Sequence, residues 1–261
     1  MRNLRTLLMC AAMATTTAVA AHAGSFSPVN TRPVSINPST PAGELSLQQI
    51  LDQMFPGGGV SADANQSVAG EWGVGVLPAS VIPTLSFEYA GNASTNVLGL
   101  WSGNDTNSLT MVDLFYGSAV GSNDSPDGFV TNASLAWNAT GSALRIGAYD
   151  GCGTAVNCGT FSGINPYAFG FYLRVPGADG PTTFFTVDAL NGDGGAHALA
   201  IRDGSTRDWA IAFEDGTDQD FNDSVLKVES LQPVPEPGTL LLFGTGIAGG
   251  LARLRRRTNP A

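Results

Sequence analysis

The clearest alternating pattern in the chain is Phe169-Gly170-Phe171-Tyr172-Leu173-Arg174-Val175. Its odd positions are apolar, and its even positions are smaller or polar apart from Tyr172. Successive side chains of a β-strand point to opposite faces, so the pattern predicts a strand with one buried and one more solvated face. The segment Leu85-Ser86-Phe87-Glu88-Tyr89 alternates in the same way.

Short segments of this kind continue from Trp72 onward, separated by clusters of Gly, Asn and Asp. A spacing of roughly ten residues between strands is typical of a sandwich or barrel. The sequence therefore predicts an all-β fold, a jelly-roll-like β-sandwich, and leaves the strand order open. The predicted strands are residues 80–89, 96–101, 109–116, 133–137, 144–149, 168–175, 182–188, 197–202, 208–213 and 224–230.

One segment has a helical pattern instead. Its apolar residues recur at i, i+3, i+4 and i+7: Leu47, Ile50, Leu51 and Met54. Ser46 is a candidate N-cap, and the Pro-Gly-Gly-Gly run from Pro56 ends the helix. Residues 26–43 are rich in Pro, Ser and Thr, which predicts an extended arm or a loosely packed leader.

The last residues of the chain have a different composition. Val234, Pro235, Glu236 and Pro237 precede an apolar run over residues 239–252, which is followed by Arg253, Arg255, Arg256 and Arg257. A helix over 238–252 would be about 22 Å long, shorter than the ~30 Å hydrocarbon core of a bilayer. We expect a short hydrophobic helix that anchors the chain only transiently in the inner membrane, with the arginines on the cytoplasmic side. A buried C-terminal helix of a soluble domain is the alternative.

This tail resembles the PEP-CTERM anchor of Gram-negative bacteria that make exopolysaccharide. The resemblance rests on the Pro-Glu-Pro signature, the hydrophobic stretch and the arginine cluster in that order. It implies export across the inner membrane, cleavage near Pro-Glu-Pro by an exosortase-type enzyme, and a final place at the cell surface or in the extracellular matrix.

The N-terminus predicts the same route. Arg2 and Arg5 form a basic region, residues 6–20 are apolar or small, and Ala21 and Ala23 form an Ala-x-Ala cleavage site. A transmembrane helix is the alternative, and the polar stretch that follows argues against it. The sequence thus divides into a signal peptide (1–23), a Pro/Ser-rich leader with a short helix (24–70), a β-sandwich domain (71–231) and a sorting and anchor tail (232–261).

Charge excludes some partners. The precursor has a formal net charge of −10, and many of its basic residues lie in the two terminal segments. The basic residues left in the body are Arg32, Arg145, Arg174, Arg202, Arg207 and Lys227. Nucleic acid and anionic lipid need neutralising Lys and Arg, so neither is an expected partner. Cations and neutral glycans remain possible, and a solubility role for the acids is the alternative.

Cys152 and Cys158 are the cysteines that remain once Cys10 is removed with the signal peptide. An isolated close pair in an exported chain predicts a disulfide that closes a tight loop. A metal site is the alternative, although two cysteines without a nearby His make a poor zinc site.

The most acidic stretch predicts a metal site. The turn after the strand at 208–213 carries these oxygen ligands close together: Glu214, Asp215, Asp218, Asp220, Asn222 and Asp223. Calcium takes six to eight oxygens, and carboxylates this close repel one another without a counterion. The alternative is that Asp220 and Asn222 bond the backbone of the turn while the other acids face water.

A second group, Asp188, Asn191 and Asp193, offers further oxygens if its loop folds beside the first. An ordinary Asn/Asp/Gly turn is the alternative interpretation.

Residues 71–230 resemble a calcium-associated domain of unknown function that is common in PEP-CTERM proteins and large bacterial surface proteins. The resemblance rests on the turn at 213–215, the Asp-x-Asp-Phe-Asn-Asp block at 218–223 and the segment 188–199. It implies a metal-binding architecture and supplies no enzymatic activity and no substrate.

Catalytic signals are weak. His197 is the histidine left after His22 leaves with the signal peptide, and no nucleophile motif accompanies it. We therefore expect a non-enzymatic surface or matrix protein stabilised by calcium. The alternatives are a carbohydrate-binding module that attaches to exopolysaccharide through its aromatic residues, and an enzyme acting on glycans.

Overall fold

The computed structural model describes residues 26, 31–38, 44–88, 95–117, 131–148, 152, 155–204, 206–216 and 218–234. The predicted signal peptide and the tail beyond Val234 lie outside these residues. They include Ala21, Ala23, Pro235, Glu236, Pro237, Arg253, Arg255, Arg256 and Arg257. In the described ranges, no helix is long and apolar enough to cross a membrane.

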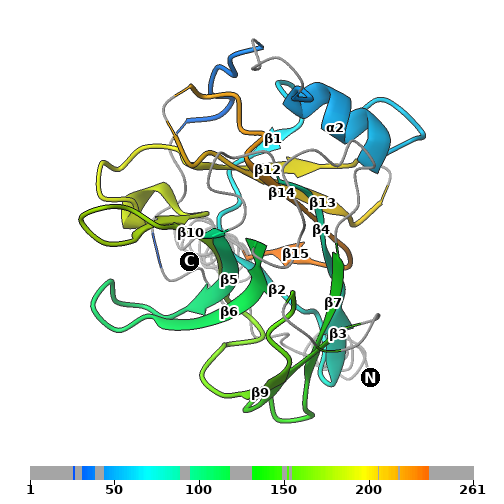
Figure 1. Cartoon of the computed structure of the whole chain (residues 1–261). Coiled ribbons are helices and arrows are strands. Elements are labelled where there is room, and N and C mark those ends of the chain that lie inside the picture. Colours follow the sequence, from blue (N-terminus) through cyan, green and yellow to red (C-terminus); the bar gives the residue numbers. More distant parts are fainter. Residues whose placement is uncertain are drawn as a thin grey trace, which may run out of the picture.

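Two antiparallel sheets form the body (Figure 1). The larger sheet contains, in spatial order, β1 (Gln66–Ser67), β12 (Ala198–Arg202), β13 (Trp209–Phe213), β14 (Ser224–Val228), β4 (Pro83–Glu88), β7 (Thr131–Trp137), β8 (Leu144–Ala148) and β9 (Gly159–Phe161), with β3 (Ala79–Val81) also paired to β7. The smaller sheet contains β11 (Thr182–Phe185), β10 (Gly170–Val175), β5 (Val97–Ser102) and β6 (Thr110–Tyr116). A two-stranded ribbon joins β15 (Gln232–Pro233) to β2 (Trp72–Gly73).

The predicted all-β fold with one short helix is confirmed, and each predicted strand overlaps an observed one. The helix is α2 (Leu47–Met54), and a short 3₁₀ helix, η3 (Asp188–Leu190), follows β11. As in a jelly roll, two antiparallel sheets share a core. With nine and four strands, however, they depart from the eight-stranded jelly-roll arrangement.

The main core lies between the sheets. Its fully buried residues include Leu100 and Leu173 from the smaller sheet and Leu135 and Ile211 from the larger one. Because both sheets contribute to one hydrophobic cluster, they pack as a sandwich.

The other face of the larger sheet is covered by α2 (Figure 1). Ser46 caps the helix in a capping box, since its side chain accepts the Gln49 N–H and the Gln49 side chain accepts the Ser46 N–H. The apolar face of α2 joins a second cluster with Leu199, Ile201 and Ala210. The apolar periodicity of α2 and its N-cap therefore determine which side chains of the helix pack on this sheet.

The outer face of β10 is buried at Tyr172 and partly exposed at Arg174, so the prediction of a more solvated face is corrected at Tyr172. Tyr172 is 0% exposed and packs with Trp101 and Phe185 in a third cluster. Its partner across the strands is Gly99, where an added Cβ would overlap the Tyr172 ring. The Tyr172 hydroxyl donates to Asp113. Glycine on one strand thus lets a large side chain lie flat on the sheet.

The N-terminal leader is attached to the body. Arg32 donates to both carboxylate oxygens of Asp188 at 3.0 and 2.9 Å. The backbone of Val34 exchanges hydrogen bonds with the Gln66 side chain at 2.9 and 3.0 Å. Residues 31–38 therefore form an extended arm with specific anchors.

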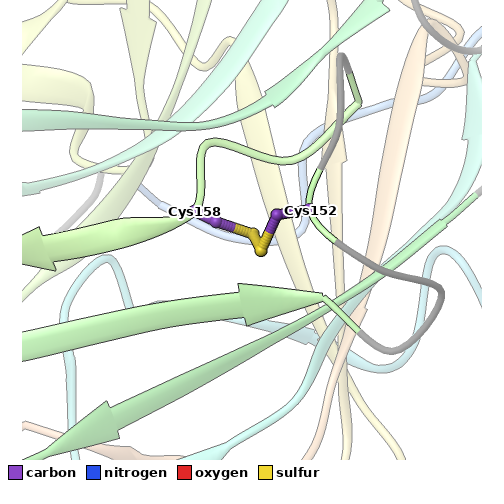
Figure 2. Close-up of a disulfide and its surroundings, with 2 residues drawn as sticks. All are labelled: Cys152 and Cys158. Carbon is purple, nitrogen blue, oxygen red and sulfur yellow. A yellow bond between two sulfur atoms is a disulfide. The ribbon is translucent and has the colours of Figure 1, made fainter.

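Cys152 and Cys158 form a disulfide with an S–S distance of 2.09 Å (Figure 2). Cys158 lies immediately before β9. The bond closes the loop that leads into the last strand of the larger sheet.

Candidate functional site

The first predicted group of metal residues lies in the loop between the neighbouring strands β13 and β14, which we call the acidic loop (residues 214–216 and 218–223). Gln219 and Phe221 have φ values of 62° and 54°, in the left-handed region that non-glycine residues rarely adopt. Phe221 is 2% exposed and packs with the residues of α2. The loop is therefore compact and anchored in the core.

Four carboxylates of the acidic loop converge. Glu214, Asp218, Asp220 and Asp223 each offer an oxygen atom, and these oxygens all lie within 4.8 Å of one another. Glu214 and Asp220 are buried, Asp223 is half-buried and Asp218 is exposed. One cation could contact all four side chains while remaining accessible from the side of Asp218.

Backbone hydrogen bonds fix these carboxylates. Glu214 accepts the N–H groups of Gly216 and Phe221 through its two oxygens, at 2.9 and 3.2 Å. The Asp223 carboxylate accepts the Asp215 N–H at 2.6 Å, and Asp220 Oδ1 accepts the Asn222 N–H at 3.3 Å. The alternative in which the acids bond their own turn is thus partly realised, but a carboxylate oxygen can accept more than one bond.

Two buried oxygens in the loop have no hydrogen-bond partner: Asp220 Oδ2 and Asn222 Oδ1. Both residues are 1% exposed. A buried acceptor without a partner costs about 1–3 kcal/mol. A cation bound by the four converging carboxylates could supply the partner that Asp220 lacks, and Asn222 Oδ1 is a further buried oxygen in the same loop.

The electrostatics of the apo loop are unfavourable. Burial raises the pKa of Asp220 to about 6, and the charge of Asp218 adds to the rise. Burial is also the main cause that raises the pKa of Glu214 to about 7 and that of Asp223 to about 8. Raised carboxyl pKa values mean that ionised oxygens are disfavoured here until a positive charge compensates them.

Asp215 lies beside the four carboxylates and has another partner. Its Oδ2 accepts a hydrogen bond from Asn96 Nδ2 at 3.1 Å, and burial raises its pKa. The side-chain oxygen of Asn222, Oδ1, has no hydrogen-bond partner, while its Nδ2 donates to the Leu45 carbonyl at 3.0 Å.

The residues of the second predicted group bond to other parts of the chain. Asp188 forms the ion pair with Arg32, and both side chains are almost fully buried. Asn191 accepts the Phe185 N–H at 2.7 Å and donates to the Gly195 carbonyl at 2.8 Å. Asp193 accepts the Gly195 N–H and pairs with His197 Nε2 at 3.0 Å. The group of converging carboxylates identified in the described residues includes neither Asp188 nor Asp193.

Three residues that contact the acidic loop were not predicted from the sequence: Glu44, Asn37 and Asn96. Glu44 interacts with Asn222 and Asp218, and burial is the main cause of its raised pKa. Asn37 bonds the loop backbone, and Asn96 bonds Asp215. These residues lie more than one hundred positions before the loop, and no local pattern marks them.

The donor set is made of oxygen atoms, which hard cations prefer and zinc does not. Four carboxylates converge, and the unpaired Asn222 amide oxygen is a further buried oxygen in the same loop. The residues present therefore fit a calcium-type ion better than a transition metal.

Two sequence families match parts of the chain. Residues 233–257 match the PEP-CTERM protein-sorting motif. Residues 165–231 match a domain of unknown function, DUF4114, and this region holds both the acidic loop and the Asp188–Asp193 group.

A search of curated proteins finds no significant match. Among solved structures, the lectin CV2L of Chromobacterium violaceum, determined with alpha-methyl-fucoside, is similar at 12% identity. The similarity covers 63% of this chain and 96% of the lectin chain, with a TM-score of 0.27. A TM-score this low supports no statement about function.

The chain thus carries a PEP-CTERM protein-sorting motif at residues 233–257, which implies export, surface sorting and processing by an exosortase, and its β-body contains a DUF4114 region.

Proposed function

We propose that the protein is a non-enzymatic cell-surface or extracellular-matrix protein whose β-sandwich is stabilised by calcium in the acidic loop. The observation that carries the proposal is the convergence of Glu214, Asp218, Asp220 and Asp223, together with the unpaired oxygen of the buried Asp220. The converging carboxylates and Asn222 Oδ1 would be the protein ligands, and water would complete the six to eight oxygens that calcium takes.

The sorting motif supports the location. Val234, directly before Pro235, donates its N–H to the Glu71 carbonyl at 3.0 Å. The folded body therefore reaches the start of the motif, and cleavage near Pro-Glu-Pro would leave the sandwich intact.

A non-enzymatic role agrees with the surroundings of His197. Its ring stacks on Phe184 with 4.1 Å between the ring centroids, and its Nε2 pairs with Asp193. These contacts support a structural histidine at the start of β12.

Isothermal titration calorimetry tests the metal assignment. We expect one calcium ion to bind the wild-type protein and none to bind Asp220→Asn, because the variant loses a buried ligand charge. Asp179→Asn is the matched control, since Asp179 is exposed in another turn. Equal binding by wild type and Asp220→Asn would refute the site.

The sequence predicted glycan binding through aromatic residues, whereas in the structure a cavity is the feature that favours it. The four tryptophans, Trp72, Trp101, Trp137 and Trp209, are at most 2% exposed, so they offer no stacking surface. A cavity of about 400 Å³ instead lies between the end of α2, the β12–β13 loop and β14. Lys227 and Asp208 line it as an ion pair with 3.6 Å between their charged atoms, and Lys227 also pairs with Glu229 at 3.5 Å, so the cavity combines a charged donor and a charged acceptor that hydroxyl groups could bond.

A blocking variant tests this second candidate. A Cβ at Gly57, on the rim of the cavity, would meet nothing within 4 Å, so Gly57→Leu should fold and fill the opening. Gly192→Leu, at an equally open position in another loop, is the control. Retention on exopolysaccharide that is lost only in Gly57→Leu would support glycan binding, and equal retention of both variants would contradict it.

A further inference from the structure

The acidic loop contacts a distant part of the chain. Asn37 donates its backbone N–H to the Gln219 carbonyl at 2.8 Å and its Nδ2 to the Asp218 carbonyl at 3.1 Å. Asn222 Nδ2 donates to the Leu45 carbonyl at 3.0 Å. The loop therefore bonds both the extended arm and the residue just before the N-cap of α2.

Candidate ligand residues alternate along the loop with residues of positive φ. Asp218, Asp220 and Asn222 supply the candidate metal oxygens. Gln219 and Phe221, which lie between them, have positive φ values and contact the N-terminal segment through a carbonyl and a buried ring, in addition to the contacts made by the Asp218 carbonyl and Asn222 Nδ2. An ion bound by residues 218, 220 and 222 would thus hold Gln219 and Phe221 in the left-handed conformation in which they contact the N-terminal segment.

We propose that the metal-bound acidic loop is the docking site for the N-terminal segment, defined as Asn37 and residues 44–54, so that calcium controls the attachment of α2 to the larger sheet. The inference rests on the proposed metal site and adds a partner for it within the chain. Arg32 and Val34 have separate anchors at Asp188 and Gln66, so the arm stays attached upstream.

The segment covers an apolar surface. Leu47, Ile50 and Leu51 of α2 are at most 1% exposed and pack on Leu199 and Ile201 of the larger sheet. If the segment detaches, this face of the sheet becomes accessible. Calcium would then decide whether the protein presents a closed surface or an apolar one.

Hydrogen exchange of the purified protein in EDTA and in calcium tests the proposal. At one hundred times Kd, a ligand lowers the population of any open state that cannot bind it by about 100-fold. We expect the amides of α2 to gain protection by up to this factor. Amides in the β8–β9 pairing, at the edge of the larger sheet and three strands or more from β14, serve as the internal comparison.

A variant separates docking from metal ligation. Asn37 is not a candidate ligand, yet linkage is reciprocal, so Asn37→Ala should weaken both calcium affinity and the calcium-dependent protection of α2. Asn107→Ala is the control, because Asn107 bonds Asp105 within its own exposed turn.

The outcomes are distinguishable. Calcium binding measured by calorimetry without a change in α2 protection would overturn the docking inference and leave the metal site standing. Absence of calcium binding would overturn both. Binding together with increased α2 protection, reduced in Asn37→Ala but not in Asn107→Ala, would support the inference.

Discussion

Asp220 is a buried carboxylate with one oxygen bonded to a backbone N–H and the other without a partner. At pH 8 its charge lacks compensation in the apo protein. Replacing it by asparagine removes this charge and keeps the shape. We predict that Asp220→Asn is more stable than wild type in EDTA, by on the order of 1–3 kcal/mol. Urea unfolding at pH 8 measures this difference.

The same substitution should remove the stabilisation by calcium. Asp179→Asn, at an exposed position, should leave both quantities unchanged. A destabilised apo Asp220→Asn would mean that the carboxylate makes a favourable contact in the metal-free loop.

The raised pKa values of Asp220, Glu214 and Asp223, about 6, 7 and 8, predict a pH dependence. In the unfolded chain these groups titrate near pH 4. Between about pH 4 and 8 the native state therefore binds more protons than the unfolded state, and the free energy of unfolding of the apo protein falls as pH rises.

Unfolding in EDTA at pH 5 and pH 8 checks the sign. We expect lower stability at pH 8 in EDTA, and a larger gain from calcium at pH 8, because ionised carboxylates bind the metal. An apo protein that is more stable at pH 8 would contradict the electrostatics of the loop.

At the scale of single residues, the sequence predicted a ligand-rich loop because its acids are neighbours in the chain. It could not assign Asp188, whose partner Arg32 lies 156 positions away. The spacing of residues in a turn shows which oxygen atoms lie close together in the chain. It does not show which of those oxygens are paired with distant residues.

Among the elements, β10 shows how a large side chain can be buried on the outer face of a sheet. Tyr172 lies over Gly99, and its hydroxyl reaches Asp113, which also accepts from Arg174 at 2.8 Å. Gly99→Ala would force a Cβ into the ring. We predict a loss of about 1–3 kcal/mol, the usual range for overpacking, measurable by chemical denaturation.

Gly192→Ala is the matched control, since a Cβ at Gly192 meets nothing within 4 Å. Equal stability of the two variants would show that Tyr172 can move without cost.

Periodicity predicted the strands that carry enough residues to alternate, and capping residues predicted α2. The elements it missed are β1, β2, β9 and β15, which have two or three residues each. Strands this short exist because a partner is present: β2 and β15 pair with each other from opposite ends of the body. Pairing of this kind leaves no pattern in the sequence.

Over the whole molecule, α2, the larger sheet and the smaller sheet stack in layers, and a further cluster covers the outside of the smaller sheet. The sequence predicted a sandwich but not that both outer faces carry apolar clusters. The acidic loop lies where the N-terminal segment meets the larger sheet. Metal bound there would stabilise contacts between parts that are distant in the chain.

The most direct test of this account is thermal unfolding of residues 24–234 in EDTA and across a calcium titration, for wild type and Asp220→Ala. At one hundred times Kd, calcium should stabilise the wild type by about 2.7 kcal/mol. For a domain of this size the melting temperature would rise by about 5–10 °C. We expect no such rise in Asp220→Ala. An unchanged wild-type melting temperature, or an equal rise in the variant, would refute a calcium site in the acidic loop.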